Sequence, residues 1–352
     1  MREGITKRFC IRSSPKYPSC HASTLCESRD GTLIAACYAG RREGSPDSVV
    51  LGTRLGPGKS DWSEPEVWVD VAQRAPANPR LFEGPDERLW LLVGVNYGRW
   101  CSGDTYLFVK RSSDTGRTWK DLELLVERKG LLGRNRPFHH DNVWIIPTEW
   151  EATWSAAFIR SEDGGRSWEI VGDLGKRARA HLIQPAVVQL AGGGLMTFMR
   201  SQEGCIYRSY SWDCGKTWSV PEPTDLPNNN SGIELIRLRS GILALIYNPT
   251  RAGKLPKELG EEWPEKMPVG FSRWGPRTPL VIDFSPDEGE SWPWRITLEE
   301  GPGEYSYPSA IQTADGALHV TYTYNRKAIM HAIIPETVIQ ATCVPGKKGE
   351  PR

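Results

Sequence analysis

The chain alternates apolar and polar residues in short runs, and one arrangement of runs recurs six times. An alternating run is followed by a tight turn and a second apolar run, as in His21 to Leu25, Asp30-Gly31 and Leu33 to Tyr38. Alternation on both sides of a two-residue turn predicts an antiparallel β-hairpin. The six predicted hairpins begin at His21, Asn78, Arg136, Gln184, Ser231 and Tyr307.

A second repeat, the octet Ser-x-Asp-x-Gly-x-x-Trp, follows four of these hairpins. Its copies are Ser112 to Trp119, Ser161 to Trp168, Ser211 to Trp218 and Ser285 to Trp292. Asp can accept hydrogen bonds from the backbone that follows it, Gly supplies a positive φ, and Trp packs as a large apolar anchor. Each octet is therefore predicted to be the turn between the third and fourth strands of one unit.

Six hairpins, each extended to four strands, predict an all-β fold, a six-bladed β-propeller with four-stranded antiparallel blades. Residues 9–343 are expected to form this single domain, with Phe9 to Ile11 closing the sixth blade as its last strand. The Pro-rich stretch Lys254 to Trp274 breaks the period and predicts a long insertion on one face. Residues 344–352 predict a frayed tail.

Composition excludes several classes of function. The formal net charge of +1 gives no reason to expect a nucleic-acid partner, and no run of 18 apolar residues indicates a membrane span. The first residues show no apolar leader, which predicts a cytoplasmic protein unless a leader has been removed. The eight cysteines lack zinc-site spacing and suit reduced thiols, and His139-His140-Asp141 is better interpreted as a hairpin turn than as a metal site. We expect no metal and no cofactor, and the oligomeric state stays open.

The first strands of a propeller line its central channel, so their starts should meet at one mouth. The hairpin starts given above are polar or aromatic, and the second strands should return further polar groups to the same mouth. The returning residues are Arg41, Arg42, Asn96, Tyr97, Glu149, Arg200, Asn248 and Asn325. A guanidinium binds a carboxylate with two parallel hydrogen bonds. The pattern therefore predicts a pocket for a small anionic ligand with several hydroxyl groups.

The octets resemble the Asp boxes of the sialidase superfamily, and the resemblance runs from about Pro18 to Asn325. It implies an exo-glycosidase that removes a terminal acidic sugar, sialic acid or a related ulosonic acid, from a glycan. Asp boxes lie on blade turns away from the mouth, so they speak for the fold and not for the activity.

Sialidases hold the substrate carboxylate with three arginines. The second is similar to Arg200 and the third to Arg277, whereas the position of the first, in Pro18 to Ala22, has no Arg and offers only His21. Two arginines should hold a carboxylate less tightly than three.

The resemblance also implies catalytic residues. The acid of the family corresponds to Asp47, in the loop Gly40 to Asp47, and the nucleophile to Tyr305 or Tyr307. A Glu that assists the nucleophile is replaced by Gln184, for which Glu304 or Glu203 could substitute. Tyr suits this chemistry because the attacked carbon bears a carboxylate, which would repel an anionic nucleophile.

Two other classes of function remain open. One is another carbohydrate reaction at the same mouth, either a uronic-acid-directed hydrolysis or a β-elimination that uses His21 and a Tyr. The other is a glycan-binding propeller without catalysis. An acidic glycan is the expected partner in every case.

Overall fold

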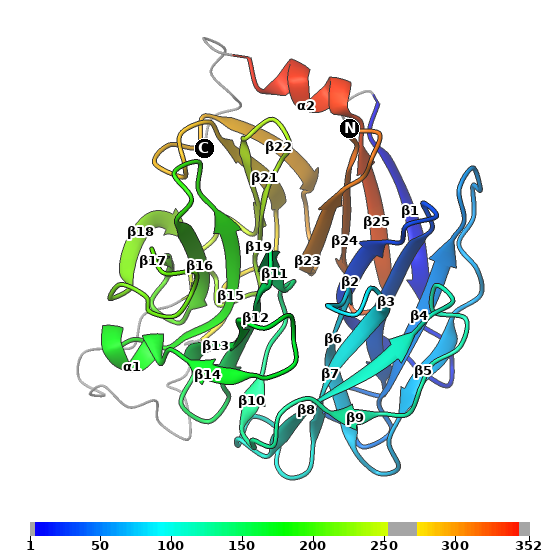
Figure 1. The fold of residues 1–352 in the computed structure, drawn as a ribbon. Coiled ribbons are helices and arrows are strands. Elements are labelled where there is room, and N and C mark those ends of the chain that lie inside the picture. The colour runs from blue at the N-terminus through cyan, green and yellow to red at the C-terminus, as the bar shows by residue number, and fades with distance from the viewer. Residues whose placement is uncertain (1–3, 253–272, 345–352) are drawn as a thin grey trace.

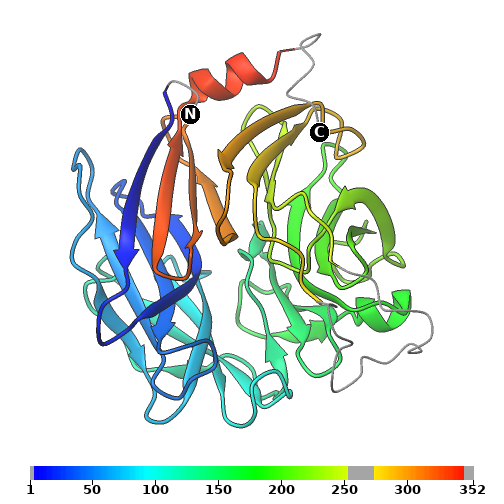
Figure 2. The same cartoon turned by 180° about the vertical axis from the view of Figure 1, so that it is seen from behind.

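Antiparallel β-sheets dominate the regular secondary structure of the computed structural model, which describes residues 4–252 and 273–344. The sheets stand around a common centre (Figures 1 and 2). The first comprises β2 (Ser19–Glu27), β3 (Leu33–Gly40), β4 (Val49–Leu55) and β5 (Glu66–Asp70). The second comprises β6 (Ala75–Glu83), β7 (Leu89–Asn96), β8 (Thr105–Ser112) and β9 (Glu123–Leu124).

The middle of the chain forms one nine-stranded sheet where the sequence predicts two separate ones. Its first part comprises β10 (Leu131–Leu132), β11 (Phe138–His140), β12 (Val143–Trp150), β13 (Ser155–Ser161) and β14 (Glu169–Val171). Its second part comprises β15 (Leu182–Gln189), β16 (Leu195–Ser201), β17 (Cys205–Ser211) and β18 (Glu222–Pro227). A single parallel pair, Ser155 with Leu182, joins the two parts.

The chain ends in two further four-stranded sheets. One comprises β19 (Glu234–Arg237), β20 (Leu243–Tyr247), β21 (Leu280–Ser285) and β22 (Trp294–Glu299). The other comprises β23 (Tyr305–Gln312), β24 (Leu318–Tyr324), β25 (Ala328–Ile334) and, from the opposite end of the chain, β1 (Thr6–Arg12). The pairing of Phe9 with Met330 confirms the predicted closing strand, and β1 and β25 lie side by side in Figure 1.

Two short helices, α1 (Leu174–Ala178) and α2 (Glu336–Thr342), were not predicted from the alternating pattern. Within residues 4–252 and 273–344, neither these nor any other helix is long and apolar enough to cross a membrane. All eight cysteines are free thiols; Cys26 and Cys37 are buried and Cys205 is half-buried. Of the predicted insertion only Arg273 and Trp274, and of the predicted tail only Val344, fall within the described residues.

The octets form self-contained turns between third and fourth strands, as predicted. In the third copy, Ser211 Oγ donates to Asp213 Oδ1 over 2.9 Å and accepts from the Gly215 amide over 2.9 Å. The amide of Thr217 donates to Asp213 Oδ1 over 2.8 Å. Trp218 then stacks on Phe158 with ring centroids 4.4 Å apart. Residues close in sequence thus satisfy nearly all of the turn's polar groups.

The inner strands contact one another in succession: β2 contacts β6 and β23, β15 contacts β12 and β19, and β19 contacts β23. Apolar clusters fill the space between neighbouring sheets, for example Phe82 and Trp90 against Trp144 and Ile159. Because the sheets pack against one another in this way, the inner strands surround the centre, and the first residues of these strands lie close together.

Four inner strands share an irregularity close to where they begin. Ala22, Asn78, Gln184 and Tyr307 adopt φ values of 55°, 47°, 54° and 54°, and the pairing register shifts at each of them. A positive φ is unfavourable for residues with a Cβ and recurs at functional sites. This repeated bulge turns the side chains of different sheets toward one mouth.

Candidate functional site

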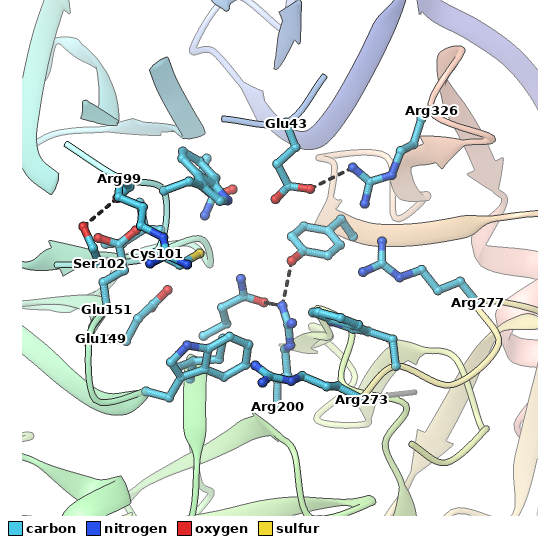
Figure 3. Close-up of a pocket in the computed structure, with 18 residues that line it drawn as sticks. Glu43, Arg99, Cys101, Ser102, Glu149, Glu151, Arg200, Arg273, Arg277 and Arg326 are labelled. Carbon is cyan, nitrogen blue, oxygen red and sulfur yellow. Dashed lines mark hydrogen bonds and ion pairs between the residues drawn. The ribbon is translucent and has the colours of Figure 1, made fainter. Parts of the chain in front are cut away.

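A pocket of ≈ 810 Å³ opens where the inner strands begin (Figure 3). The bulge supplies three of its lining residues, because Asn78, Gln184 and Tyr307 all face it. The remaining lining residues are Glu43, Arg99, Trp100, Cys101, Ser102, Leu132, Glu149, Glu151, Trp154, Ile183, Arg200, Arg273, Trp274, Arg277 and Arg326.

Tyr307 and Arg200 form the centre of the site. Arg200 Nη1 donates to Tyr307 Oη over 2.6 Å and to Gln184 Oε1 over 3.2 Å. Its Nε donates to Asn230 Oδ1 over 2.9 Å. Arg200 is only 3% exposed, and these hydrogen bonds fix its buried guanidinium. The sequence placed Arg200 and Tyr307 in different hairpins, and the structure brings the two side chains into contact.

Arg277 and Arg326 form the neighbouring part of the wall, and Glu304 holds both. Glu304 Oε1 accepts from Arg277 Nη1 over 2.6 Å and from Arg326 Nε over 2.9 Å. Burial alone would raise the pKa of Glu304, but the two guanidiniums prevail and lower it. Glu304 does not itself line the pocket; it positions two arginines that do.

Arg326 is a lining residue that sequence reasoning missed. It directly follows Asn325, which the alternating pattern did place at the mouth, so the sequence indicated the neighbouring residue. Its Nη1 donates to Glu43 Oε2 over 2.8 Å, and its backbone oxygen accepts from the Cys20 amide over 2.9 Å. The guanidinium thus reaches the first sheet from the last one.

Glu149 and Glu151 line the side of the pocket opposite Arg277 and Arg326 (Figure 3). Glu149 is the penultimate residue of β12 and Glu151 directly follows the strand, and both are at least 96% buried. Burial raises the pKa of Glu149 to about 7, although the charges of Arg80 and Arg200 oppose the shift. Burial also raises the pKa of Glu151.

The loop after β3 presents Glu43, not the predicted acid Asp47, to the pocket. Asp47 Oδ2 accepts from the backbone amide and the Nε of Arg41, both over 3.2 Å, and its Oδ1 accepts from Ser45. Its carboxylate therefore closes its own loop. Gly44 packs against Trp100 so closely that a Cβ there would lie 2.7 Å from the indole, which holds Glu43 beside the pocket.

His21 lies behind the site and does not line the pocket. It is fully buried, its ring centroid is 4.3 Å from that of Tyr307, and its Nδ1 is 2.9 Å from Thr323 Oγ1. Burial, reinforced by the nearby arginines, lowers the pKa of His21 well below its ordinary value. A neutral imidazole therefore supports the phenol ring from below.

Arg136 lies outside the pocket and lines a separate cavity of ≈ 210 Å³. The predicted hairpin forms, because β11 pairs with β12, but its start at Arg136 does not reach the pocket. The short strand β10, which precedes it, pairs with the end of β12 at Glu149 and Trp150. Arg134 is buried with its guanidinium 5.0 Å from the Tyr307 ring, and its Nη1 donates to Ile233 O over 3.0 Å.

The other predicted site residues have positions that the pocket does not include. Tyr305 Oη donates to Pro302 O over 3.3 Å, and Asn248 Nδ2 donates to Tyr305 O over 2.9 Å. Arg41 and Arg42 are exposed on their loop. Glu203 accepts from the His181 amide over 3.2 Å. Across the described parts of the chain, no cluster of three or more His, Cys, Asp or Glu could hold a metal ion.

Solved structures with a similar fold include several sialidases. The leech intramolecular trans-sialidase complexed with 2,7-anhydro-Neu5Ac aligns with a TM-score of 0.72 at 14% identity, over 96% of this chain and 71% of that one. The Hadza microbial sialidase Hz136 aligns with a TM-score of 0.72 at 18% identity, over 93% and 67%. A protein of unknown function from Dyadobacter fermentans aligns with a TM-score of 0.70 at 15% identity, over 94% and 99%. At these identities the likeness is one of fold.

Sequence comparison gives two further matches. A curated relative, the anhydrosialidase of Macrobdella decora, is 25% identical over 129 residues, which are 34% of this chain and 17% of that protein. The family model described as "BNR repeat-like domain" matches residues 31–320. Because this match spans most of the chain, the protein belongs to the BNR repeat-like family, within the sialidase superfamily.

Proposed function

We propose that this protein is a sialidase-like exo-glycosidase that hydrolyses a terminal acidic sugar, sialic acid or a related ulosonic acid, from a glycan. The observation that carries the proposal is that Arg200, Arg277 and Arg326 line one pocket together with Tyr307. The proposal includes a six-bladed propeller, in which the nine-stranded sheet counts as two blades joined by the single Ser155–Leu182 pair.

The three arginines are suited to bind a carboxylate, a group that forms hydrogen bonds with water while it is free in solution. Arg200 is held by Asn230, and Arg277 and Arg326 are held by Glu304, so little side-chain entropy is lost when a ligand binds. The lining contains five arginines and three glutamates, which leaves a cationic excess for an anionic sugar. The hydroxyl groups of a sugar would meet amides such as Asn78 and Gln184.

Arg326 supplies the third guanidinium that the sequence of the first hairpin lacks. The end of β24 lies against β2, as the contact of His21 with Thr323 and the Cys20–Arg326 backbone bond indicate. A guanidinium from the last sheet can therefore serve the place where a sialidase has an arginine from the first.

Tyr307, and not Tyr305, is the nucleophile in this proposal, because only Tyr307 lines the pocket. Its phenol approaches a carbon that bears a carboxylate without the repulsion that an anionic side chain would meet. Within the described residues, the hydrogen bond from Arg200 is the only one made to Tyr307 Oη. Gln184 occupies the place of the assisting carboxylate, so the phenol proton passes to water.

One observation favours glycan binding without catalysis as a second candidate. An amide such as Gln184 cannot accept the phenol proton in the way a carboxylate does. The elimination mechanism receives less support, because His21 is buried behind Tyr307 and has no face on the pocket.

The test is the release of free acidic sugar from a sialylated lactose and from an aryl sialoside. We expect turnover by the parent protein and a loss on the order of 10²-fold or more in Tyr307→Phe. Tyr305→Phe, a matched change outside the pocket, should stay close to the parent. Binding of sialic acid without any release from either substrate would replace the glycosidase with the binding protein.

A further inference from the structure

Two buried carboxylates of the pocket, Glu149 and Glu151, differ from its third glutamate, Glu43, which is paired with Arg326. Glu149 and Glu151 are 2% and 4% exposed, and each has one oxygen, Oε2 and Oε1 respectively, without a hydrogen-bond partner. Neither forms an ion pair within the described residues, although five arginines line the same pocket. A buried polar atom without a partner is costly and suggests a use.

Glu149 is the better placed of the two for proton transfer. Its burial raises the pKa to about 7, so the carboxyl group keeps a proton in much of the range in which an ordinary Glu has lost it. Glu151 is occupied differently, because its Oε2 accepts from the Gly103 amide over 3.1 Å and from Thr105 Oγ1 over 2.8 Å.

The position of Glu149 relative to Tyr307 also suits a shared reaction. The backbone amide of Gln184 interacts with the Glu149 carboxyl group, while the Gln184 side chain and Tyr307 Oη both accept from Arg200 Nη1. Gln184 thus connects Glu149 with the Arg200–Tyr307 pair, and Glu149 and Tyr307 both line the pocket.

We propose that Glu149 is the proton donor to the leaving-group oxygen, in place of a carboxyl group on the loop after β3. The inference rests on the proposed glycosidase function and assigns a role within it. Asp47 is turned into its own loop, and Glu43 is engaged by Arg326, so neither carboxylate of that loop presents a free acid to the pocket.

The proton balance of the hydrolysis closes with Glu149 and water. In the first half, the Glu149 proton moves to the glycosidic oxygen, the carbon–oxygen bond breaks with its electron pair on oxygen, and Tyr307 Oη bonds to the carbon. The phenol proton passes to water. In the second half, a water oxygen bonds to the carbon, the bond to Tyr307 breaks with its electron pair on Oη, and Glu149 takes a proton from that water. Oη regains its proton from water.

The dependence on the leaving group tests this assignment. A sugar alcohol is a poor leaving group and needs the proton, whereas an aryl alcohol departs with little help. In Glu149→Gln we expect a loss on the order of 10²-fold or more with sialylated lactose and a loss below about 10-fold with an aryl sialoside. With the parent protein and sialylated lactose, the rate should fall as the pH rises through about 7, because the donor must carry its proton.

The matched control is Glu151→Gln, which changes an equally buried carboxylate of the same wall. It should affect both substrates by a similar factor. Equal losses with both substrates in Glu149→Gln, or a parent profile that stays flat between about pH 6 and pH 8, would overturn the role of Glu149. The parent profile decides the question even if the variant does not fold, and a parent that releases no acidic sugar would instead contradict the proposed function.

Discussion

The charged side chains on the two sides of the pocket differ in whether they have partners. On the cationic side, Arg200, Arg277 and Arg326 each have an amide or carboxylate partner that fixes the guanidinium. On the acidic side, Glu149 and Glu151 are buried without an ion pair among the described residues. A fixed cation recognises a charged ligand at low entropic cost, whereas an unpaired, buried carboxyl group has its pKa moved toward neutrality. In the proposed reaction, this difference separates the groups that bind the sugar from the group that transfers the proton.

The largest effect should come from removing the cations. Arg277→Met and Arg326→Met each take away a charged hydrogen-bond donor, worth about 1.5–3 kcal/mol in binding. We expect affinity for free sialic acid, measured by calorimetry, to fall on the order of 10- to 10²-fold in each. Arg117→Met, an exposed arginine on an octet turn, is the control. Unchanged affinity in both pocket variants would remove the functional distinction between the two sides.

A carboxylate added at the centre should have a smaller effect of the opposite sign. Gln184→Glu places a base beside the Arg200 nitrogen that also contacts Tyr307 Oη, so the phenol proton gains an acceptor. We expect kcat to rise about 10-fold, while Gln184→Met, of similar size but without a base, should be slower than the parent. A fall in kcat with Gln184→Glu in a folded protein would argue against a nucleophilic Tyr307.

Glu234 offers a test, outside the pocket, of whether burial alone explains the raised pKa of Glu149. Glu234 is also 2% exposed and lies outside the pocket, and burial raises its pKa to about 7 although Arg134 and Arg136 oppose the shift. A carboxyl group with a raised pKa stabilises the fold below its unfolded pKa, and this contribution is lost as the pH rises through the folded pKa.

Replacing Glu234 with Gln should therefore raise the free energy of unfolding more at high pH than at low pH. Relative to the parent, Glu234→Gln should gain stability between about pH 5 and pH 7.5, by up to about 3 kcal/mol. Thermal melting of the parent and the variant at these two pH values measures the stability difference. In the variant, sialoside turnover should depend on the leaving group as it does in the parent. A stability difference that does not change with pH would mean that burial does not control this carboxyl group.

The smallest effect is expected far from both sides, on an octet turn. Asp213→Ala removes the acceptor for the Thr217 amide and for Ser211 Oγ. The loss should be about 1 kcal/mol of folding stability, with turnover unchanged. Altered substrate affinity in this variant would show that the turns and the mouth are coupled.

The octet turns and the mouth also differ in how well the sequence predicts them. An octet satisfies its own polar groups within eight residues, so Ser211 to Trp218 could be interpreted without any knowledge of the rest of the chain. The hairpins and the closing strand were predictable for the same reason, since alternation is a local property. The single pair that joins two predicted sheets was not, because it depends on how the sheets meet.

At the mouth, a displacement of one to four residues changes which side chain lines the pocket. Arg136 lines a separate cavity, and the arginine that packs against the Tyr307 ring is Arg134, which follows β10 and does not line the pocket either. Glu43 replaces Asp47 because loop hydrogen bonds, which no periodicity encodes, turn the Asp47 carboxylate away. Arg326 escaped notice because its partner Glu43 is 283 residues distant in sequence.

The most direct test of the account is a crystal structure of the protein with a bound acidic monosaccharide, such as a dehydrated sialic acid. We predict that its carboxylate lies against the guanidiniums of Arg200, Arg277 and Arg326, with the reacting carbon facing Tyr307 Oη. A sugar bound with its carboxylate toward Glu149 or toward solvent would contradict the account.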